Sequence, residues 1–476
     1  MSDVVGRLLL GSALLAGLIC RVFVVFTDDG IYWPDEVYQS LEPAHFLVFG
    51  YGLLPWEFVE GARNWALPGL VALAMQLSVV AGADTPDRYL LVVRLLFVLI
   101  SMTAAVGIYR LARGLGASEL GGAAGAAAWA LAAPAIYFAH RGLGENVAAA
   151  AAVWAAALML PPARSRVRLW IGASLLGIAV LFRLQMGLVA LSLLGVIAAE
   201  RRWVEVRLAL GVLAGWAVAY GALDAITWSD VDGARYGGWF HSAITYLRFN
   251  LFEGRAEEWG TAPAQYYAVQ LFRSMPLLAV AIAVGLVAGI RRTTGLTATV
   301  MLFLAAHSLV GHKEYRFMLP IVPLAMAAAA VGLDALPRRV RHMGVAAMLA
   351  AAVVSASSFP SLTWGDLGAY PDRAAASAWD NAGSINRLLM AAHHQADLCG
   401  LRVDVLPAWQ GGASHLHRRV PFYWGVPAEA GLYNYAITNA GAGLPVAARD
   451  GDMVLVKLPL VRDCAPSPQG FRWRLP

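Results

Sequence analysis

Gly311-His312-Lys313-Glu314-Tyr315-Arg316-Phe317, with Pro320 just behind it, is the stretch around which the rest of the chain can be interpreted. It places an imidazole, an ammonium, a carboxylate and a guanidinium within five residues, between the apolar runs Val300 to Val310 and Met318 to Leu333. Ionisable groups at the mouth of hydrocarbon-length segments are costly, so they are expected to face protein or water rather than lipid. The plainer interpretation is a solvated loop whose Lys and Arg set the membrane topology. A second, acidic cluster near the N-terminus favours a membrane-embedded functional site instead.

The composition is that of a membrane protein with many spans. The 476 residues are 59% hydrophobic and only 14% charged, whereas soluble globular proteins carry about 25% charged residues. The net charge of +5 is not a nucleic-acid signature, because the arginines fall in short clusters between apolar runs, as membrane topology requires. Lysine occurs only at Lys313 and Lys457, while Arg and Ala are abundant, a bias typical of a GC-rich bacterial genome.

Apolar runs and Arg clusters together predict eleven transmembrane spans. Leu8 to Phe26 is long enough to cross a bilayer core of roughly 30 Å, and Asp28-Asp29 behind it is unlike a signal-peptide cleavage site, so we predict an anchored helix. Ala66 to Ala83 is predicted to be interfacial or re-entrant, because counting it as a span would move every later Arg cluster to the opposite side. The other ten predicted spans are Tyr89 to Tyr109, Leu120 to Phe138, Val147 to Leu160, Leu169 to Phe182, Met186 to Ala199, Leu208 to Thr227, Ala268 to Ile290, Leu296 to Val310, Met318 to Leu336 and Met343 to Ser358.

The Arg clusters assign the two faces. With Arg7, all of them then lie on the cytoplasmic face by the positive-inside rule, and the C-terminus lies outside. These clusters are Arg110/Arg113, Arg164/Arg166/Arg168, Arg201/Arg202/Arg207, Arg291/Arg292 and Arg338/Arg339/Arg341. The outer face receives residues 27–88 with interfacial helices, 140–146, 228–267, 312–317 and 359–476. This segregation predicts an active site on the outer face.

Two domains are predicted, a transmembrane domain over residues 1–358 and an exterior α/β domain over residues 359–476. The second is rich in Pro, Asp, His and Gly, and it has a helical pattern from Asp372 to Gln395. Short apolar or alternating runs that predict strands follow at Leu401–Leu406, Val420–Trp424, Tyr433–Ile437 and Met453–Lys457. Cys399 and Cys464 could form a disulfide if this region is exported, a question that the sequence leaves open.

An acidic motif lies in the first outer loop. Asp35 follows Pro34 directly at a predicted helix start, so its carboxylate could simply cap that helix. The functional interpretation is a general base that takes the proton of a sugar hydroxyl attacking an anomeric carbon. Glu36 is adjacent and would point in another direction on a helix. At most one of the two is therefore the base, and the other would orient the acceptor or bind a basic residue.

The central stretch fits the complementary task. Transfer of a sugar from a lipid phosphate leaves a phosphate that gains charge as the glycosidic bond breaks, and fixed cations beside it stabilise that charge. His312 and Arg316 are four residues apart, on one face if the segment is helical. Lys313 would supply a point charge and Arg316 a bidentate fork. Glu314 would hold one of these cations in place, or form a purely structural salt bridge.

Further candidate residues lie at the predicted outer ends of spans. Arg63, Arg141 and Arg183 run against the positive-inside trend, so each is a candidate for the donor phosphate or for an ion pair with a loop carboxylate. Trp259 and Tyr266 belong to an aromatic segment that either re-enters the bilayer or anchors at its interface.

These motifs resemble those of glycosyltransferase family 22, the α-mannosyltransferases of N-glycan and GPI-anchor assembly. The family's His-Lys-Glu-x-Arg-Phe sequence before a proline-containing helix is matched by residues 312–317 with Pro320 and Pro323. Its first-loop pattern, Asp-Glu…Glu-Pro-x-His…Gly-x-Gly…Trp-Glu, is matched at Asp35, Glu36, Glu42, Pro43, His45, Gly50, Gly52, Trp56 and Glu57. Trp259-Gly260-Thr261 with Tyr266-Tyr267 is similar to a third family region. The likeness spans residues 8 to about 335 and fades afterwards, where Gly411-Gly412 to His417 is only suggestive.

The resemblance implies a GT-C fold and an inverting transfer of mannose from a polyprenyl-phosphate-mannose donor to a glycan or glycolipid acceptor, outside the cytoplasmic leaflet. It also implies a catalytic carboxylate in the first loop, placed here at Asp35 with Glu36 as the alternative, and supporting roles for Glu42, His45 and Glu57. Because the composition looks bacterial, a bacterial inner membrane with a periplasmic or exterior site is expected. The chemistry requires Asp35 and His312 to meet in one lipid-fed cavity.

Two other functions stay open. One is a related GT-C transferase that moves another lipid-phosphate sugar, such as an aminoarabinose or a hexose, onto lipid A or protein. The other is a lipid-linked sugar transporter or flippase, which inverted repeats with helices broken near the midplane would favour, and none is seen. The sequence has no Gly-rich nucleotide cradle and no Cys/His zinc spacing, and His415 with His417 is a weak metal pattern. No metal, cofactor or nucleic acid is therefore expected.

Overall fold

The computed structural model describes residues 2–162, 165–231, 236–404, 410–424, 431–439, 443–458 and 464. Its contacts divide the chain into two compact units. The first unit joins Met1–Val24 to Leu96–Ala378, and the second joins Val25–Leu95, which contains the first loop, to Trp379–Pro476. The domain boundary at residue 358 stays a prediction, while the contacts group the first loop with the C-terminal region.

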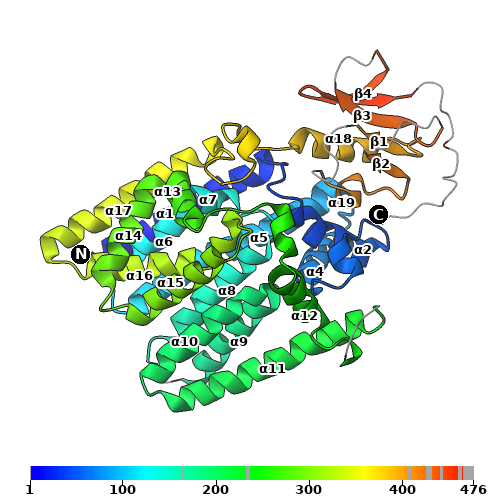
Figure 1. The fold of residues 1–476 in the computed structure, drawn as a ribbon. Coiled ribbons are helices and arrows are strands. Elements are labelled where there is room, and N and C mark those ends of the chain that lie inside the picture. The colour runs from blue at the N-terminus through cyan, green and yellow to red at the C-terminus, as the bar shows by residue number, and fades with distance from the viewer. Residues whose placement is uncertain are drawn as a thin grey trace. The chain divides into compact units, whose positions relative to one another are not determined.

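The first unit is built from helices (Figure 1). Among the described residues, four helices are long and apolar enough to cross a membrane: α1 (Ser2–Thr27), α5 (Pro86–Gly114), α11 (Trp203–Trp228) and α17 (Arg338–Ser358). The other helices of ordinary length are α6 (Glu119–Leu131), α8 (Gly144–Met159), α9 (Arg166–Phe182), α10 (Gly187–Ala199), α13 (Tyr266–Ser274), α14 (Pro276–Gly289), α15 (Thr294–Leu309) and α16 (Val322–Asp334). Short helical segments are α7 (Ala133–Tyr137), η2 (Leu184–Met186), η3 (Tyr236–Gly238), α12 (His241–Leu247), η4 (Arg248–Phe252), η5 (Arg255–Trp259), η6 (Tyr315–Met318), η7 (Phe359–Ser361) and η8 (Pro371–Arg373). The prediction of a mainly helical membrane protein is confirmed, and the count of eleven spans stays a prediction.

Arg21 on α1 stabilises a break between two helices of the first unit. The predicted span Leu120 to Phe138 is divided into α6 and α7, because Pro134 lacks the N–H that a continuous helix needs there. The break leaves main-chain carbonyl groups without helical partners, which is costly in an apolar environment. The guanidinium of Arg21 is buried and donates to the carbonyl oxygens of Trp129, Ala130 and Ala135 on the two sides of this break.

Arg21→Met should therefore strongly destabilise the first unit. Each buried carbonyl oxygen that loses its donor costs about 1–3 kcal/mol. We expect a clear fall in the thermal unfolding midpoint of the detergent-purified protein, and little monodisperse protein on size exclusion. The matched control is Arg7→Met, because Arg7 is largely exposed in its ion pair with Glu119 and such pairs contribute little. An unfolding midpoint of Arg21→Met equal to that of the Arg7 variant would contradict this role.

The predicted span Ala268 to Ile290 is also divided. α13 ends at Ser274, and Pro276 begins α14, a position where its missing N–H is not needed. α14 then packs very closely on α16. A Cβ atom at Gly332 would lie 1.9 Å from the carbonyl oxygen of Gly285, so glycine is required for this approach.

The second unit contains the helices of the first loop and the C-terminal sheet. Its helical segments are η1 (Val37–Leu41), α2 (Glu42–Phe49), α3 (Trp56–Val59), α4 (Ala66–Val80), α18 (Gly383–His393) and α19 (Ala413–Leu416). α4 is the helix for which the sequence predicts an interfacial or re-entrant position. Its 15 residues are mostly apolar, and it packs against α2 and η1. Its placement in the membrane stays a prediction.

The C-terminal sheet confirms the predicted small α/β region (Figure 1). Its strands are β1 (Leu401–Val403), β2 (Phe422–Trp424), β3 (Tyr435–Asn439), β4 (Val446–Asp450) and β5 (Met453–Lys457). The order is β2-β1-β3-β5-β4, with β1 parallel to both neighbours and β5 antiparallel to both of its own. The apolar face of α18, including Leu388 and Leu389, packs with Leu401, Ile437 and Leu455 of the sheet.

Two local predictions for this region need correction. The helix expected from Asp372 begins only at Gly383, because Asp380 and Ala382 have φ values of 52° and 62°, a left-handed conformation that interrupts a helix. β4 was not predicted, because its Val-Ala-Ala-Arg-Asp sequence at the sheet edge has little β propensity. Residues 405 and 406 of the first predicted strand lie outside the described residues. The structure joins Cys399 and Cys464, the pair that the sequence left open, in a disulfide.

Candidate active site

Buried side chains of alternating charge form a connected group in the first unit, beginning with the central stretch. The carboxylate of Glu314 accepts hydrogen bonds from Nε of Arg316 at 2.7 Å and from its Nη2 at 2.9 Å. It also lies 3.1 Å from Nε2 of His312. The other ring nitrogen of His312 lies 3.0 Å from the carbonyl oxygen of Gly260. Glu314 was predicted to hold one cation in place, and both His312 and Arg316 are in position to be that cation.

Two residues from other parts of the chain extend this group. Glu145 is in the first turn of α8, and Arg183 follows the last residue of α9. One oxygen of Glu145 lies 3.0 Å from Nη2 of Arg183 and 3.7 Å from Nε of Arg316. The guanidinium groups of Arg183 and Arg316 both lie 5.4 Å from the centre of the Phe317 ring. Glu145 was not among the predicted site residues, although it stands in the polar segment at residues 140–146.

Pairing outweighs burial in setting the charges of this group. Burial alone would raise the pKa of Glu314, but Arg316 and His312 hold that pKa at about 2. Burial also opposes the charged form of His312, yet the neighbouring Glu314 carboxylate leaves the pKa of His312 above its ordinary value. Because Arg316 has an exposed fraction of only 2%, its positive charge depends on these carboxylates. The group is thus a rigid, desolvated array of charges.

Lys313 and Arg141 are held differently from Arg316. The ammonium of Lys313 donates to the main-chain oxygens of Ala262 at 2.7 Å, of Gly311 at 3.4 Å and of Val310. These three contacts match its three N–H donors and tie two loops together. The guanidinium of Arg141 is buried and lies 4.5 Å from the centre of the Tyr137 ring. Phosphate binding by Lys313 and Arg141 stays a prediction.

The two adjacent tyrosines of α13 have different environments. The hydroxyl of Tyr266 donates to the carbonyl oxygen of Gly368 at 2.9 Å, so it anchors α13 to a main-chain segment. Tyr267 is only 1% exposed, and its hydroxyl has no hydrogen-bond partner among the described residues. Burial raises the pKa of Tyr267, with Glu314 adding to the rise and Arg183 opposing it, which places its hydroxyl among the charged group. Trp259, in contrast, is 60% exposed.

The acidic motif of the first loop lies in the second unit. The main-chain N–H groups of Val37 and Tyr38 donate to the carbonyl oxygen of Pro34, so Asp35 and Glu36 lie in the first turn of a helical segment. The Glu36 carboxylate is buried and accepts the N–H of Tyr32 at 2.9 Å, whereas Asp35 is half-buried. This difference in environment favours Asp35 as the residue that a substrate can reach.

Glu57 is an acidic group that interacts electrostatically with Asp35. Its buried carboxylate accepts a hydrogen bond from Gln39 at 3.0 Å. Burial and then the negative charge of Asp35 raise the pKa of Glu57 to about 7, while Arg63 opposes the rise. The carboxyl group of Glu57 can therefore hold a proton near neutral pH.

The pH dependence of stability should report on Glu57. The unfolded chain binds this proton with a pKa near 4.5 and the folded protein with a pKa of about 7, so the folded state is favoured by the proton. This stabilisation is complete below pH 4.5 and is lost as the pH rises through 7. Glu57→Gln keeps a neutral acceptor for Gln39 and should flatten this part of the profile. Thermal unfolding midpoints between pH 5 and 8 test it, and equal slopes for both proteins would contradict it.

Glu42 and His45 bind the segment at residues 410–417, which the sequence analysis found only suggestive. The buried carboxylate of Glu42 accepts the main-chain N–H groups of Leu53 at 3.1 Å, Ala413 at 3.1 Å and Ser414 at 2.6 Å. Nε2 of His45 lies 2.9 Å from Nδ1 of His417. These contacts give both motif residues a structural partner in the C-terminal region. Their involvement in substrate binding stays a prediction.

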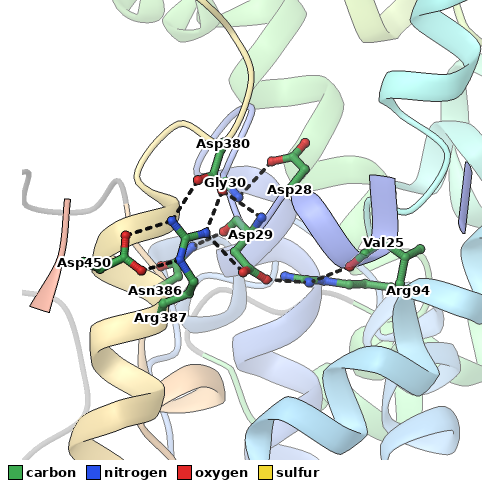
Figure 2. A network of polar contacts seen from close by, with 9 residues as sticks. All are labelled: Val25, Asp28, Asp29, Gly30, Arg94, Asp380, Asn386, Arg387 and Asp450. Carbon is green, nitrogen blue, oxygen red and sulfur yellow. Dashed lines mark hydrogen bonds and ion pairs between the residues drawn. The ribbon is translucent and has the colours of Figure 1, made fainter. Parts of the chain in front are cut away.

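Figure 2 shows a charged network in the second unit that the sequence analysis missed. Arg387 on α18 donates two hydrogen bonds to Asp380 and two to Asp450, at 2.7–3.0 Å. It also contacts Asp29, which pairs with Arg94 of α5 at 2.7 Å. The network therefore fixes the start of the first loop to α18 and β4. The Asp28-Asp29 pair directly after an apolar span was the signal that could have pointed to it.

The described residues contain no group of three or more His, Cys, Asp or Glu side chains arranged to hold a metal ion.

The fold is that of the GT-C glycosyltransferases of membranes. ArnT from Cupriavidus metallidurans, solved with undecaprenyl phosphate, matches it with a TM-score of 0.61 at 14% identity, over 97% of this chain and 99% of that one. An oligosaccharyltransferase from Archaeoglobus fulgidus matches with a TM-score of 0.53 at 13% identity, over 91% of this chain and 69% of that one. At this identity the likeness establishes the fold alone.

The chain belongs to the Alg9-like mannosyltransferase family, whose model matches residues 12–365. This confirms the family expected from the motifs. GPI mannosyltransferase 3 of Yarrowia lipolytica is 29% identical over 67% of this chain and 62% of its own length. Human GPI alpha-1,2-mannosyltransferase 3 is 25% identical over 66% of this chain and 56% of its own length. The chain thus matches about three-fifths of the length of these relatives, and their eukaryotic origin gives no support to the bacterial source expected from composition.

Proposed function

We propose that this protein is a membrane-embedded, inverting mannosyltransferase that uses a polyprenyl-phosphate-mannose donor and a glycan or glycolipid acceptor. The observation that carries the proposal is the desolvated charged group of His312, Glu314, Arg316, Glu145 and Arg183 in a chain of this family. Buried arginines held by carboxylates supply fixed positive charge without reorganisation, which is what a developing phosphate charge requires. The name of the human relative supports α-linked transfer.

In the proposed reaction, Asp35 accepts the proton of the acceptor hydroxyl as its oxygen attacks the anomeric carbon. The new glycosidic C–O bond forms while the bond from that carbon to the phosphate oxygen breaks, so the sugar inverts its configuration. The electron pair leaves with the polyprenyl phosphate, whose added negative charge is stabilised by Arg183, Arg316 and protonated His312. The raised pKa of His312 supports its protonated form in this reaction. That Asp35 and His312 share one cavity stays a prediction.

The site is proposed to face away from the cytoplasm, in a bacterial inner membrane. The support for this side is the segregation of the Arg clusters from the candidate residues along the sequence. Transfer is tested with the purified full chain in proteoliposomes, given synthetic polyprenyl-phosphate-mannose and a mannosylated glycolipid acceptor. Formation of a product that an α-mannosidase removes is expected. Uptake of the donor lipid with no new glycosidic bond would favour a flippase, and transfer only from another lipid-phosphate sugar would favour the other GT-C alternative.

Tyr267 is proposed as a further ligand of the donor phosphate, because its hydroxyl is buried beside Arg183 and Glu314 without a partner among the described residues. Tyr267→Phe removes a hydrogen bond to a charged group, worth about 1.5–3 kcal/mol, so kcat should fall by about tenfold or more with an unchanged unfolding midpoint. Tyr266→Phe is the matched control, since its hydroxyl donates to the carbonyl oxygen of Gly368. It should lower the thermal unfolding midpoint and leave kcat nearly unchanged. A lower unfolding midpoint with unchanged kcat for Tyr267→Phe would contradict the proposal that Tyr267 binds the donor phosphate.

A further inference from the structure

A groove between α9 and α11 in the first unit is separate from the charged group described above. Its volume is about 540 Å³. Trp170 and Ser174 of α9 line one side, and Arg207, Gly211 and Gly215 of α11 line the other. Apart from Arg207 and the hydroxyl of Ser174, the lining is apolar. This lining suits an apolar ligand with an anionic end.

The sequence of α11 creates this groove. Gly211 and Gly215 are four residues apart and therefore lie on one face of the helix. A Cβ atom at either position would have no neighbour within 4 Å, so the space in front of both is open. Trp216, the next residue, packs on Gly177 of α9, where a Cβ atom would lie only 2.4 Å from the indole ring. That contact joins the two helices, while the glycines keep the groove between them deep.

Two polar groups in the groove point to a ligand. Ser174 is 8% exposed, and its hydroxyl has no hydrogen-bond partner among the described residues. Arg207 has no ion pair or hydrogen bond to the part of the chain that the structure describes. Arg207 also belongs to the cluster expected at the cytoplasmic surface, where anionic lipid headgroups attract basic side chains. Walls formed by Trp170 and Trp216 would hinder the close approach of a second helix, whereas a flexible acyl chain can pass between them.

We propose that this groove binds one anionic phospholipid, with an acyl chain along Gly211 and Gly215 and the headgroup phosphate on Arg207. Ser174 would donate its hydroxyl to the ester region of the same lipid. The site requires no part of the proposed transfer reaction, so a failure of either proposal leaves the other standing.

Native mass spectrometry of the full chain released from nanodiscs tests this site. Nanodiscs with equal amounts of phosphatidylglycerol and phosphatidylcholine should release protein with one phosphatidylglycerol retained. Arg207→Gln should lower that retention by about fivefold, the effect of losing one basic contact to a headgroup. Gly215→Leu should abolish it by filling the groove. Arg339→Gln, which changes an exposed Arg on the same predicted face outside the groove, should leave it unchanged.

Each alternative result overturns the proposal. Equal retention of both lipids, or equal losses in the Arg207 and Arg339 variants, would mean that the groove has no anionic site. Dimers of the chain that Gly215→Leu dissociates, without any retained lipid, would assign the Gly211 and Gly215 face to a second helix instead. Unfolding midpoints of all variants show whether a loss of lipid reflects a loss of fold.

Discussion

Replacing Asp35 by asparagine should lower the rate of mannose transfer by about 10²–10⁴-fold, the usual contribution of a general base. The substitution keeps the size of the side chain and removes only its ability to accept a proton. Asp35 is half-buried in a segment whose main chain is already held by the bonds to Pro34, so the fold should survive. Initial rates with polyprenyl-phosphate-mannose in proteoliposomes measure the effect, and the unfolding midpoint should stay within a few degrees of the original.

Glu36→Gln and Glu57→Gln are the controls for this assignment. Glu36 is buried against the N–H of Tyr32, and glutamine can still accept that hydrogen bond. Glu57→Gln mimics the protonated acid that burial favours. Neither should approach the loss seen for Asp35→Asn, although the Glu57 variant should shift the pH profile of the rate. A larger loss for Glu36→Gln would make Glu36 the base, and full activity of both Asp35→Asn and Glu36→Gln would remove the first loop from the chemistry.

Glu314→Gln should have the second large effect, on stability and activity together. It removes the carboxylate that holds Arg316 by two hydrogen bonds and contacts His312, so the buried guanidinium loses these two hydrogen bonds to a carboxylate. Breaking a buried ion pair from one side costs about 3–5 kcal/mol. We expect a large fall in the thermal unfolding midpoint, or failure to obtain monodisperse protein.

The matched control for that experiment is Glu258→Gln. Glu258 pairs with Arg255 at 3.5 Å, but both side chains are about half exposed, and such pairs contribute little. It should therefore behave like the unmodified protein. If Glu314→Gln unfolds at the same temperature as the Glu258 variant, the charged group is not a rigid array, and its part in the proposed function falls with it.

The sequence predicted the membrane class, the family and the polar segments well, because hydropathy, Arg placement and motifs are local properties. It also identified His312, Glu314, Arg316 and Arg183 separately, but it could not show that Glu145 joins them. That contact depends on where α8 begins and α9 ends, not on any local pattern. For Lys313, the motif predicted a role in phosphate binding. The contacts of its ammonium group in the structure are to main-chain oxygens, which no local sequence pattern indicates.

Helix breaks were the second reason why the predicted spans differ from the observed helices. Pro134 and Pro276 divide two predicted spans, and hydropathy averages hide such single residues. Arg21 lies inside an apolar run, and its presence there is explained by its contacts to Ser101 and to carbonyl oxygens beside one of these breaks. The segment at residues 410–417 has little sequence signal of its own. Its role became visible only from the N–H groups of Ala413 and Ser414 that donate to the Glu42 carboxylate.

The hydrogen bonds from the main-chain N–H groups of Ala413 and Ser414 to Glu42 have a practical consequence for protein engineering. A chimaera that exchanges only the C-terminal region with a relative would set a foreign backbone against this carboxylate and against Asp29, the partner of Arg387. Grafts should therefore transplant Val25–Leu95 and Trp379–Pro476 as one cassette. Junctions at residues 24, 95 and 378 keep these anchoring pairs intact.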